Sequence, residues 1–278
     1  MAGDLITSTA NPRVKAADRL RDRRERDERG RTIVDGTREI LRAIEAGADV
    51  DELWVAPGQC RSDDCRAARA AVPADRQIEA SEAVLDRLAF GDRSEGIVAV
   101  VRTPSTSLGG VVRAPDSIVV VLEGVEKPGN LGAVLRSVDA AGAGALILAD
   151  PRTDPFNPNV IRASLGTVFA VPIGVGSADE VRAWLGERGL RVVAALVDGP
   201  TQHWDADLTG PIALVLGSEA GGLTGGWSGP GVVTVRLPML GVADSLNVSV
   251  TAAVLLFEAR RQRNVAGTVP TRDGRADG

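Results

Sequence analysis

Short, wholly apolar segments alternate with helical patterns through the second half of the chain, and no other feature restricts the fold as much. The apolar segments predict strands, and the stretches between them show the periodicity of amphipathic helices. Strands without a polar face are typical of a parallel sheet covered by helices on both sides, so we expect an α/β fold. The predicted strands are 118–122, 145–149, 168–173, 192–196, 212–216 and 232–237, and the predicted helices are 130–141, 160–165, 177–188 and 245–263.

The first part of the chain shows a smaller α/β alternation. Strands are predicted at 32–35, 50–55, 76–79 and 97–101, and helices at 37–46, 61–71 and 81–88. Residues 103–116 then lose periodicity and gather Pro, Ser and Gly, which is typical of a link between domains. We therefore expect domains at 1–102 and 117–265, a linker at 103–116, and a polar, disordered tail at 266–278.

Composition excludes several chemistries. The 278-residue chain has one histidine, His203, so a two-histidine zinc site is impossible, and we expect no metal ligands. The only lysines, Lys15 and Lys127, do not follow a glycine, which excludes a Walker A phosphate loop. Cys60 and Cys65 make at most one bridge. With no apolar signal segment at the start and no run of ~18 apolar residues, we expect a cytoplasmic protein that does not bind membranes.

The net charge of −5 means that a nucleic-acid partner would need a local basic surface. Residues 11–31, expected to form one helix between Asn11 and Gly30, hold nine basic and five acidic residues. We interpret most of these charges as i,i+4 pairs on a solvated face. A few arginines there, Arg23 and Arg24 among them, are candidates for contacts with an RNA backbone.

In parallel α/β sheets, ligands bind beyond the carboxyl ends of the strands, so the segments that follow the apolar strands matter most. In the first of them, 122–137, Asn130 can cap a helix, Gly132 permits close backbone approach, and Arg136 lies one turn later. Taken alone, these residues are better explained as a cap, a packing glycine and a surface ion pair than as a catalytic group.

The second such segment, 214–223, places Gly217 and Ser218 directly after a buried strand, with two more glycines close behind. Glycines expose backbone groups to a ligand, although a plain turn explains them as well. The third segment, 235–263, leads from a strand to Ser245 and Asn247 at the expected start of the last helix. Ser245 can be a simple N-cap, yet two polar side chains and a helix N-terminus converge where a site is expected.

Taken in order, the three segments resemble the three signature motifs of the SpoU, or TrmH-like, branch of the SPOUT RNA methyltransferases. The matching stretches are N-x-G-A-x-x-R at 130–136, L-G-S-E-x-x-G at 216–222, and L-P-M followed by S-L-N-V-S-V within 237–250. The sequence FEARRQR at 257–263 matches as well. The resemblance covers roughly 118–263, while residues 33–57 resemble, with a weaker signature, the L30e-like substrate-binding domain often fused to this catalytic domain.

The resemblance implies a parallel-sheet SPOUT domain with a deep trefoil knot, preceded by a smaller L30e-like α/β domain. It also implies S-adenosylmethionine as the cofactor, held in a bent shape largely by backbone groups, and a homodimer whose site is completed across the interface. By position within the resemblance, the residues expected to bind the cofactor are Leu196, Gly217, Ser218, Leu237, Met239 and Leu246.

Arg136 matches the family's arginine that is discussed as activating the ribose 2′-hydroxyl. Because a guanidinium hardly ever loses its proton, we expect it to stabilise a developing alkoxide or to clamp the adjacent phosphate. Arg162 matches a further arginine near the RNA site. The residues expected to orient Arg136, the cofactor or the ribose are Asn130, Glu219, Ser245 and Asn247.

The implied activity is transfer of a methyl group from S-adenosylmethionine to a ribose 2′-hydroxyl, most readily in 23S ribosomal RNA because of the fused front domain. A tRNA 2′-O-methyltransferase and a non-catalytic RNA-binding assembly factor are the alternatives. Housekeeping modification is favoured over antibiotic-resistance methylation. The sequence does not identify the target nucleotide.

Overall fold

The computed structural model describes residues 5–90, 95–218 and 221–265. Within these residues the chain forms two compact units that interleave along the sequence. The first unit contains the residues up to Thr106, with Glu126–Arg136 and Arg152–Pro172. The second contains Ser107–Val125, Ser137–Pro151 and the residues from Ile173 onward. We describe each unit by itself.

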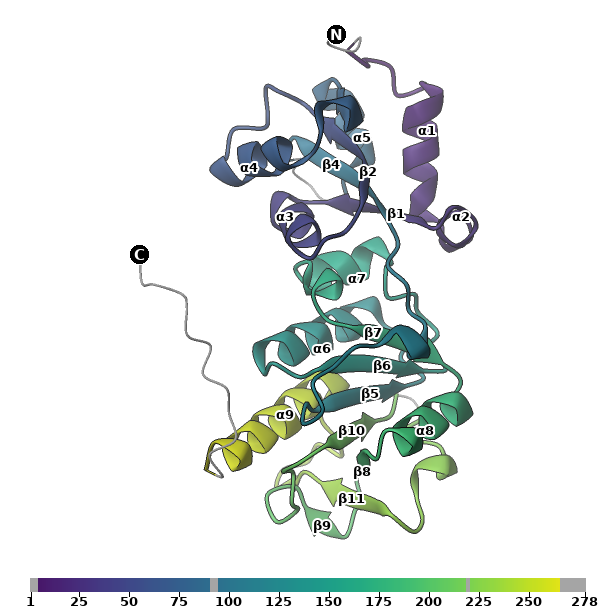
Figure 1. The fold of residues 1–278 in the computed structure, drawn as a ribbon, viewed down its shortest axis with the longest axis vertical. Helices are drawn as coiled ribbons and strands as arrows, with labels where there is room; N and C mark the ends of the chain where they lie inside the picture. Colours follow the sequence, from purple (N-terminus) through teal and green to yellow (C-terminus); the bar gives the residue numbers. More distant parts are fainter. Residues whose placement is uncertain (1–4, 91–94, 219–220, 266–278) are drawn as a thin grey trace. The chain divides into compact units, whose positions relative to one another are not determined.

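The first unit is built on a four-stranded sheet of strand order β1-β4-β2-β3 (Figure 1). β4 is antiparallel to β1 and to β2, and β2 is parallel to β3. The elements are α1 (Pro12–Asp18), η1 (Arg19–Arg21), α2 (Arg23–Arg29), β1 (Arg31–Asp35), α3 (Thr37–Glu45), β2 (Val50–Val55), α4 (Asp63–Ala71), η2 (Ala74–Arg76), β3 (Gln77–Glu79), α5 (Glu82–Leu88), β4 (Ile97–Arg102), α7 (Pro158–Ala163) and η4 (Thr167–Phe169).

Apolar residues of α1 and α5 form one core with one face of this sheet, where Val14 and Leu85 pack with Trp54 and Val98. α3 and α4 pack together on the other face, with Ile40 and Ala68 fully buried (Figure 1). The alternation of sides along each strand therefore buries the sheet between two helical layers.

The single helix expected over 11–31 is wrong. α1 and the short η1 end at Arg21, and a second helix, α2, begins after Asp22. The Asp22 carboxylate accepts a hydrogen bond from the Arg24 N–H at 2.9 Å, which is the N-cap contact that starts a new helix. Gly30 ends α2 with a φ of 60°, as the sequence predicts.

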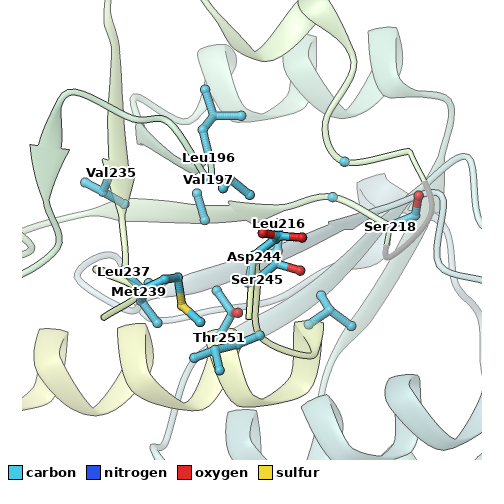
Figure 2. Close-up of a pocket in the computed structure, with 15 residues that line it drawn as sticks. Leu196, Val197, Leu216, Ser218, Val235, Leu237, Met239, Asp244, Ser245 and Thr251 are labelled. Atoms are coloured by element: carbon cyan, nitrogen blue, oxygen red, sulfur yellow. The ribbon is translucent and has the colours of Figure 1, made fainter. Parts of the chain in front are cut away.

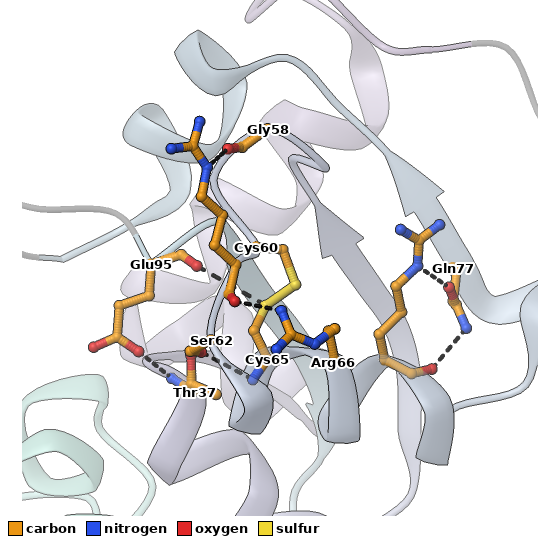
Figure 3. The surroundings of a disulfide bond; sticks show 10 residues. Thr37, Gly58, Cys60, Ser62, Cys65, Arg66, Gln77 and Glu95 are labelled. Atoms are coloured by element: carbon orange, nitrogen blue, oxygen red, sulfur yellow. Dashed lines mark hydrogen bonds between the residues drawn. A yellow bond between two sulfur atoms is a disulfide. The ribbon is translucent and has the colours of Figure 1, made fainter.

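Cys60 and Cys65 form a disulfide between the loop after β2 and the first turn of α4 (Figure 3). Ser62 begins α4 by accepting a hydrogen bond from the Cys65 N–H at 3.1 Å. Cys65 is fully buried. The bond closes a loop of a few residues at the edge of the first unit.

The second unit is built on a seven-stranded sheet of order β7-β6-β5-β10-β8-β11-β9, and each of its pairings is parallel. This confirms the predicted α/β fold with a parallel sheet. The elements are η3 (Leu108–Gly110), β5 (Val119–Glu123), β6 (Ala145–Ala149), β7 (Ile173–Gly176), α8 (Ala178–Glu187), β8 (Arg191–Ala195), β9 (Thr201–Gln202), β10 (Ile212–Leu216), η5 (Gly225–Trp227), β11 (Val232–Arg236) and α9 (Val248–Val265). α6 (Pro128–Ala140) runs from the first unit into the second at Arg136.

α8 covers one face of the large sheet, where Val181 and Trp184 pack with Val121 and Ile147. α9 lies on the opposite face, with Leu255 and Leu256 buried (Figure 1). Ser177 begins α8 with a capping box, because its hydroxyl and the Glu180 carboxylate each accept the other's backbone N–H. The helices thus cover both faces of the apolar strands.

The strand expected at 168–173 is wrong. Thr167–Phe169 is a short 3-10 turn, and the strand β7 begins only at Ile173, after Pro172. β7 carries Gly174, where a Cβ would lie 2.9 Å from the Leu108 Cδ2 atom, so a larger residue would have to displace that side chain, and the glycine weakens the strand signal. No helix in the described ranges is long and apolar enough to cross a membrane.

Candidate functional site

A cavity of about 230 Å³ opens at the carboxyl ends of β8, β10 and β11, three neighbouring parallel strands (Figure 2). Because parallel strands end at one edge of the sheet, the segments that follow them meet there with the start of α9. The lining residues are Ala195, Leu196, Val197, Leu216, Gly217, Ser218, Gly222, Val235, Leu237, Met239, Asp244, Ser245, Leu246, Val248 and Thr251.

The structure brings together in this cavity all six residues that the resemblance implies for cofactor binding, with Ser245 beside them. They come from three strand exits separated by up to about fifty residues of sequence. The first is Leu196 after β8, the second is the turn at Gly217 after β10, and the third runs from Leu237 to the start of α9. The second and third sequence motifs therefore meet with Leu196 in one cavity, whereas no residue of the first motif, 130–136, lines it.

The turn after β10 is closed on itself. The Ser218 N–H donates to the Gly222 carbonyl at 3.2 Å, and the Gly222 N–H donates back to the Ser218 carbonyl at 2.9 Å. A Cβ on Gly217 would lie 2.1 Å from the Gly222 carbonyl carbon, so only glycine fits there. At Gly217 the turn therefore presents backbone, not a side chain, to the cavity.

The exit of β8 is fastened to β11. The Leu196 N–H donates to the Val235 carbonyl at 2.8 Å. A little further on, a Cβ on Gly199 would lie 2.8 Å from the Val235 carbonyl carbon, so the two backbones are in close contact. This contact fixes Leu196 at the wall of the cavity.

The last helix begins later than predicted, and Asn247, not Ser245, is its cap. Asn247 accepts hydrogen bonds from the Ser249 N–H at 2.9 Å and the Ser249 hydroxyl at 2.6 Å. The helix therefore starts at Val248. Ser245, two residues before that cap, lines the cavity.

The cavity combines apolar walls with a few polar groups. Leu196 and Met239 are among the apolar residues, and Asp244, Ser245 and Thr251 add a carboxylate and two hydroxyls (Figure 2). Such a lining suits a ligand with an apolar or aromatic body and a cationic group. No cluster of three or more His, Cys, Asp or Glu residues in the described ranges is placed to hold a metal ion.

Asn130, Arg136 and Arg162 belong to the first compact unit, whereas the cavity belongs to the second. α6 begins at Pro128, so the expectation that Asn130 caps this helix is wrong, and Asn130 lies within its first turn. The expected close approach at Gly132 is confirmed, since a Cβ there would lie 2.7 Å from the Ala163 carbonyl carbon. Arg136 is exposed on α6.

Arg162, on α7, pairs with the Asp35 carboxylate at 3.1 Å. Burial raises the pKa of Asp35, although the Phe90 N–H and Arg162 both stabilise its charged form. The Arg162 side chain is half-exposed, while Asp35 is buried. One side of the guanidinium is thus held by the protein and the other faces solvent.

The predicted i,i+4 pairs on α2 are confirmed. Arg24 pairs with Glu28 at 2.7 Å and Arg23 with Asp27 at 3.6 Å. Exposed pairs of this kind add little stability, and each arginine is partly neutralised by its own helix. Glu219, the remaining motif residue, lies outside the described residues.

The sequence reasoning missed several residues of the cavity, notably Val197, Asp244 and Thr251. Each lies within a few residues of a predicted one. Val197 follows Leu196, Asp244 precedes Ser245, and Thr251 lies one turn into α9. The only signal for Thr251 was helical spacing from the cap, because residues three and four apart share a face.

Comparison with known proteins identifies the family. Residues 117–257 match the model of the SpoU rRNA Methylase family, and residues 11–99 match an MRM3-like substrate binding domain. A 23S rRNA (uridine(2479)-2′-O)-methyltransferase from Streptomyces viridochromogenes is 32% identical over 91% of this chain and 90% of its own length. The chain therefore belongs to the SpoU rRNA methylase family, as its motifs predict.

Solved structures agree. The crystal structure of an RNA 2′-O ribose methyltransferase superposes with a TM-score of 0.83 at 42% identity, over 94% of this chain and 100% of that one. The SpoU methyltransferase AviRb from Streptomyces viridochromogenes, crystallised with AdoMet, gives 0.84 at 31% identity, over 91% and 98%. The expected class of enzyme, an S-adenosylmethionine-dependent RNA 2′-O-methyltransferase, is confirmed.

Proposed function

We propose that the chain transfers the methyl group of S-adenosylmethionine to a ribose 2′-hydroxyl of 23S ribosomal RNA. One observation supports the site assignment: all six residues that the family resemblance implies for cofactor binding line a single cavity at the edge of the parallel sheet. The names of relatives, among them the Streptomyces viridochromogenes 23S rRNA enzyme, support the choice of substrate.

The lining fits this cofactor. Leu196, Leu237, Met239 and Leu246 would enclose its adenosine, and the backbone at Gly217 would hydrogen-bond its polar edges. The Asp244 carboxylate would face the cationic part of the molecule. When bound, the cofactor supplies a methyl group on a sulfonium, which is a good leaving group.

Arg136 carries the electrostatic part of the reaction. An exposed guanidinium stays charged at every physiological pH, so it cannot take the proton of the 2′-hydroxyl. It lowers the energy of the developing alkoxide, or holds the neighbouring phosphate so that the hydroxyl is aligned. Asn130, Glu219, Ser245 and Asn247 orient the reacting groups in this proposal.

The front of the chain binds the RNA. The match of residues 11–99 to a substrate-binding domain supports the division into an L30e-like domain at 1–102, a linker at 103–116 and a methyltransferase domain at 117–265. Arg162 is the strongest candidate for a phosphate contact, because one face of its guanidinium is exposed. To contact RNA, Arg23 and Arg24 would have to leave their ion pairs with Asp27 and Glu28 and bind phosphates instead.

We further propose that the enzyme is a cytoplasmic homodimer with the trefoil knot of its family. Exposed apolar side chains on α9 and in the turn after β11 support the dimer.

The experiment that tests the function is methyl transfer from radiolabelled S-adenosylmethionine to purified 23S rRNA and to bulk tRNA, followed by mapping of 2′-O-methyl sites. We expect one new site in 23S rRNA. Label in tRNA alone would indicate a tRNA 2′-O-methyltransferase. RNA binding without cofactor and without methyl transfer would indicate a non-catalytic assembly factor.

A further inference from the structure

Glu123 is a buried carboxylate to which none of the sequence motifs assigns a role. It ends β5 and is only 5% exposed. Both of its oxygens accept hydrogen bonds from one residue, Thr224: Oε2 from the backbone N–H at 2.7 Å and Oε1 from the hydroxyl at 2.8 Å. A buried charge is tolerated only where such bonds replace water, so this contact is strongly favoured.

Thr224 ends the segment that follows β10. Three residues of that segment, Gly217, Ser218 and Gly222, line the cavity. The turn from Gly217 to Gly222 holds itself together through the two backbone bonds described above. It is attached to the rest of the unit at its start by β10 and at its end by Thr224. Through Thr224, Glu123 therefore anchors the end of the segment in which Ser218 and Gly222 are already bonded to each other.

A second contact joins the same two strand exits. β5 and β10 are paired in parallel, with Leu122 opposite Leu216, so the residues that follow them lie side by side. A Cβ on Gly124, which has a φ of +64°, would lie 3.6 Å from the Ser218 Cβ. Gly124 therefore lies near Ser218 at the start of the turn, and Glu123 holds Thr224 just beyond its end.

From this geometry we infer that Glu123 is a positioning residue for the cofactor: through Thr224 it holds the part of the cavity wall formed by Gly217, Ser218 and Gly222 where the ligand needs it. The inference rests on the proposed function of the cavity as the S-adenosylmethionine site. Glu123 does not line the cavity, so its effect passes through the turn.

Thr224→Val tests this, because it removes the hydroxyl but keeps the side-chain volume at an exposed position. The chain offers a matched control in Thr209, whose N–H and hydroxyl both donate to the Asp207 carboxylate, at 2.9 and 2.6 Å, away from the cavity. Thr224→Ser, which keeps the donor, is the rescue variant. The readouts are calorimetric titration with S-adenosylhomocysteine, kcat and KM for S-adenosylmethionine, and the thermal midpoint.

For Thr224→Val we expect a Kd and a KM about tenfold higher than in the wild type, the loss typical of one hydrogen bond to a charged group. At saturating cofactor its kcat should stay within about twofold of the wild type, because the lost contact stabilises the bound cofactor equally in the ground state and the transition state. Thr224→Ser should restore the Kd, and Thr209→Val should leave it unchanged.

If Thr224→Val binds S-adenosylhomocysteine as tightly as the wild type, or if Thr209→Val loses as much affinity, the positioning role is refuted while the proposed function stands. If the wild-type chain itself binds none, the proposed site fails and this inference fails with it.

Discussion

In the proposed mechanism, Arg136 is the residue on which the reaction depends most directly. It is exposed on α6, and within the described ranges no carboxylate forms an ion pair with it, so its charge is free to act on a substrate. We expect Arg136→Ala to lower kcat at least about a hundredfold, the usual cost of losing one group that stabilises developing negative charge. The thermal midpoint and the Kd for S-adenosylhomocysteine should change little.

Transfer to 23S rRNA in single-turnover assays measures the effect. Arg19→Ala, at another exposed arginine of the first unit, is the control and should keep its activity. Near-normal transfer by Arg136→Ala would exclude a catalytic role for this arginine.

Asp35 makes the stability of the first unit depend on pH. Burial raises its pKa above the ordinary value, with Glu95 adding repulsion and Arg162 opposing the rise. A raised carboxyl pKa means that the folded state binds the proton more tightly than the unfolded state, so the penalty of the buried charge is relieved as pH falls through the folded pKa. As pH falls, the unfolding free energy of the wild type, measured against Asp35→Asn, should therefore increase by about 1.4 kcal/mol for each pH unit by which the folded pKa exceeds the unfolded one.

Urea unfolding of both proteins between neutral pH and the ordinary aspartate pKa checks the sign. As pH falls, the unfolding free energy of the wild type should rise relative to that of Asp35→Asn. Parallel curves for the two proteins would show that Asp35 does not titrate differently in the folded state.

At the scale of single elements, the capping box of α8 gives a clean comparison. The Ser177 hydroxyl accepts a hydrogen bond from the Glu180 N–H, and the Ser177 N–H donates to the Glu180 carboxylate. Ser81 stands at the same position before α5 but makes no cap bond with its side chain. We expect Ser177→Ala to lower the free energy of unfolding by about 1 kcal/mol, and Ser81→Ala to lower it by much less.

Chemical denaturation of the two variants measures the difference. Equal losses would mean that the hydrogen bond at Ser177 contributes no more than the serine's backbone preference.

Elements whose local signals agree with their packing could be predicted from the sequence. β6 and β10 match their predicted ranges because every residue in them is apolar and buried on both faces. β7 was placed a few residues early, since Gly174 and Gly176 weaken its strand signal. The single helix expected over 11–31 ends before Asp22, whose carboxylate caps a new helix. Among the many charged residues of this segment, the sequence pattern did not single out this cap.

The site could be predicted as a set of motif positions but not as a surface. Leu196 and Leu246 were marked by the family resemblance, whereas Val197 and Asp244 belong to residue types that occur anywhere on a surface. Glu123 was hidden for a different reason: it lies in an apolar strand, and only the fold brings Thr224, about a hundred residues later, within 2.8 Å of it.

At the scale of the whole molecule, the second unit exposes several large apolar side chains. Phe257 on α9 is 54% exposed and lies two helical turns after the exposed Val250, so both are on one face. In the turn after β11, Leu240 and Val242 are 97% and 103% exposed. Apolar side chains this open are typical of a surface that another protein covers, and a second copy of the chain is the partner we propose.

We expect sedimentation to show a dimer in the wild type, and Phe257→Glu to raise the dimer dissociation constant at least about a hundredfold, because it replaces buried apolar area with a charge. Val112→Glu, at an isolated valine 80% exposed in the same unit, should leave the dimer intact. If the site is completed across the interface, methyl transfer by Phe257→Glu should rise with protein concentration as dimers form. A wild-type chain that sediments as a monomer while methylating RNA at full rate would contradict the proposal, because every catalytic group would then have to come from one copy.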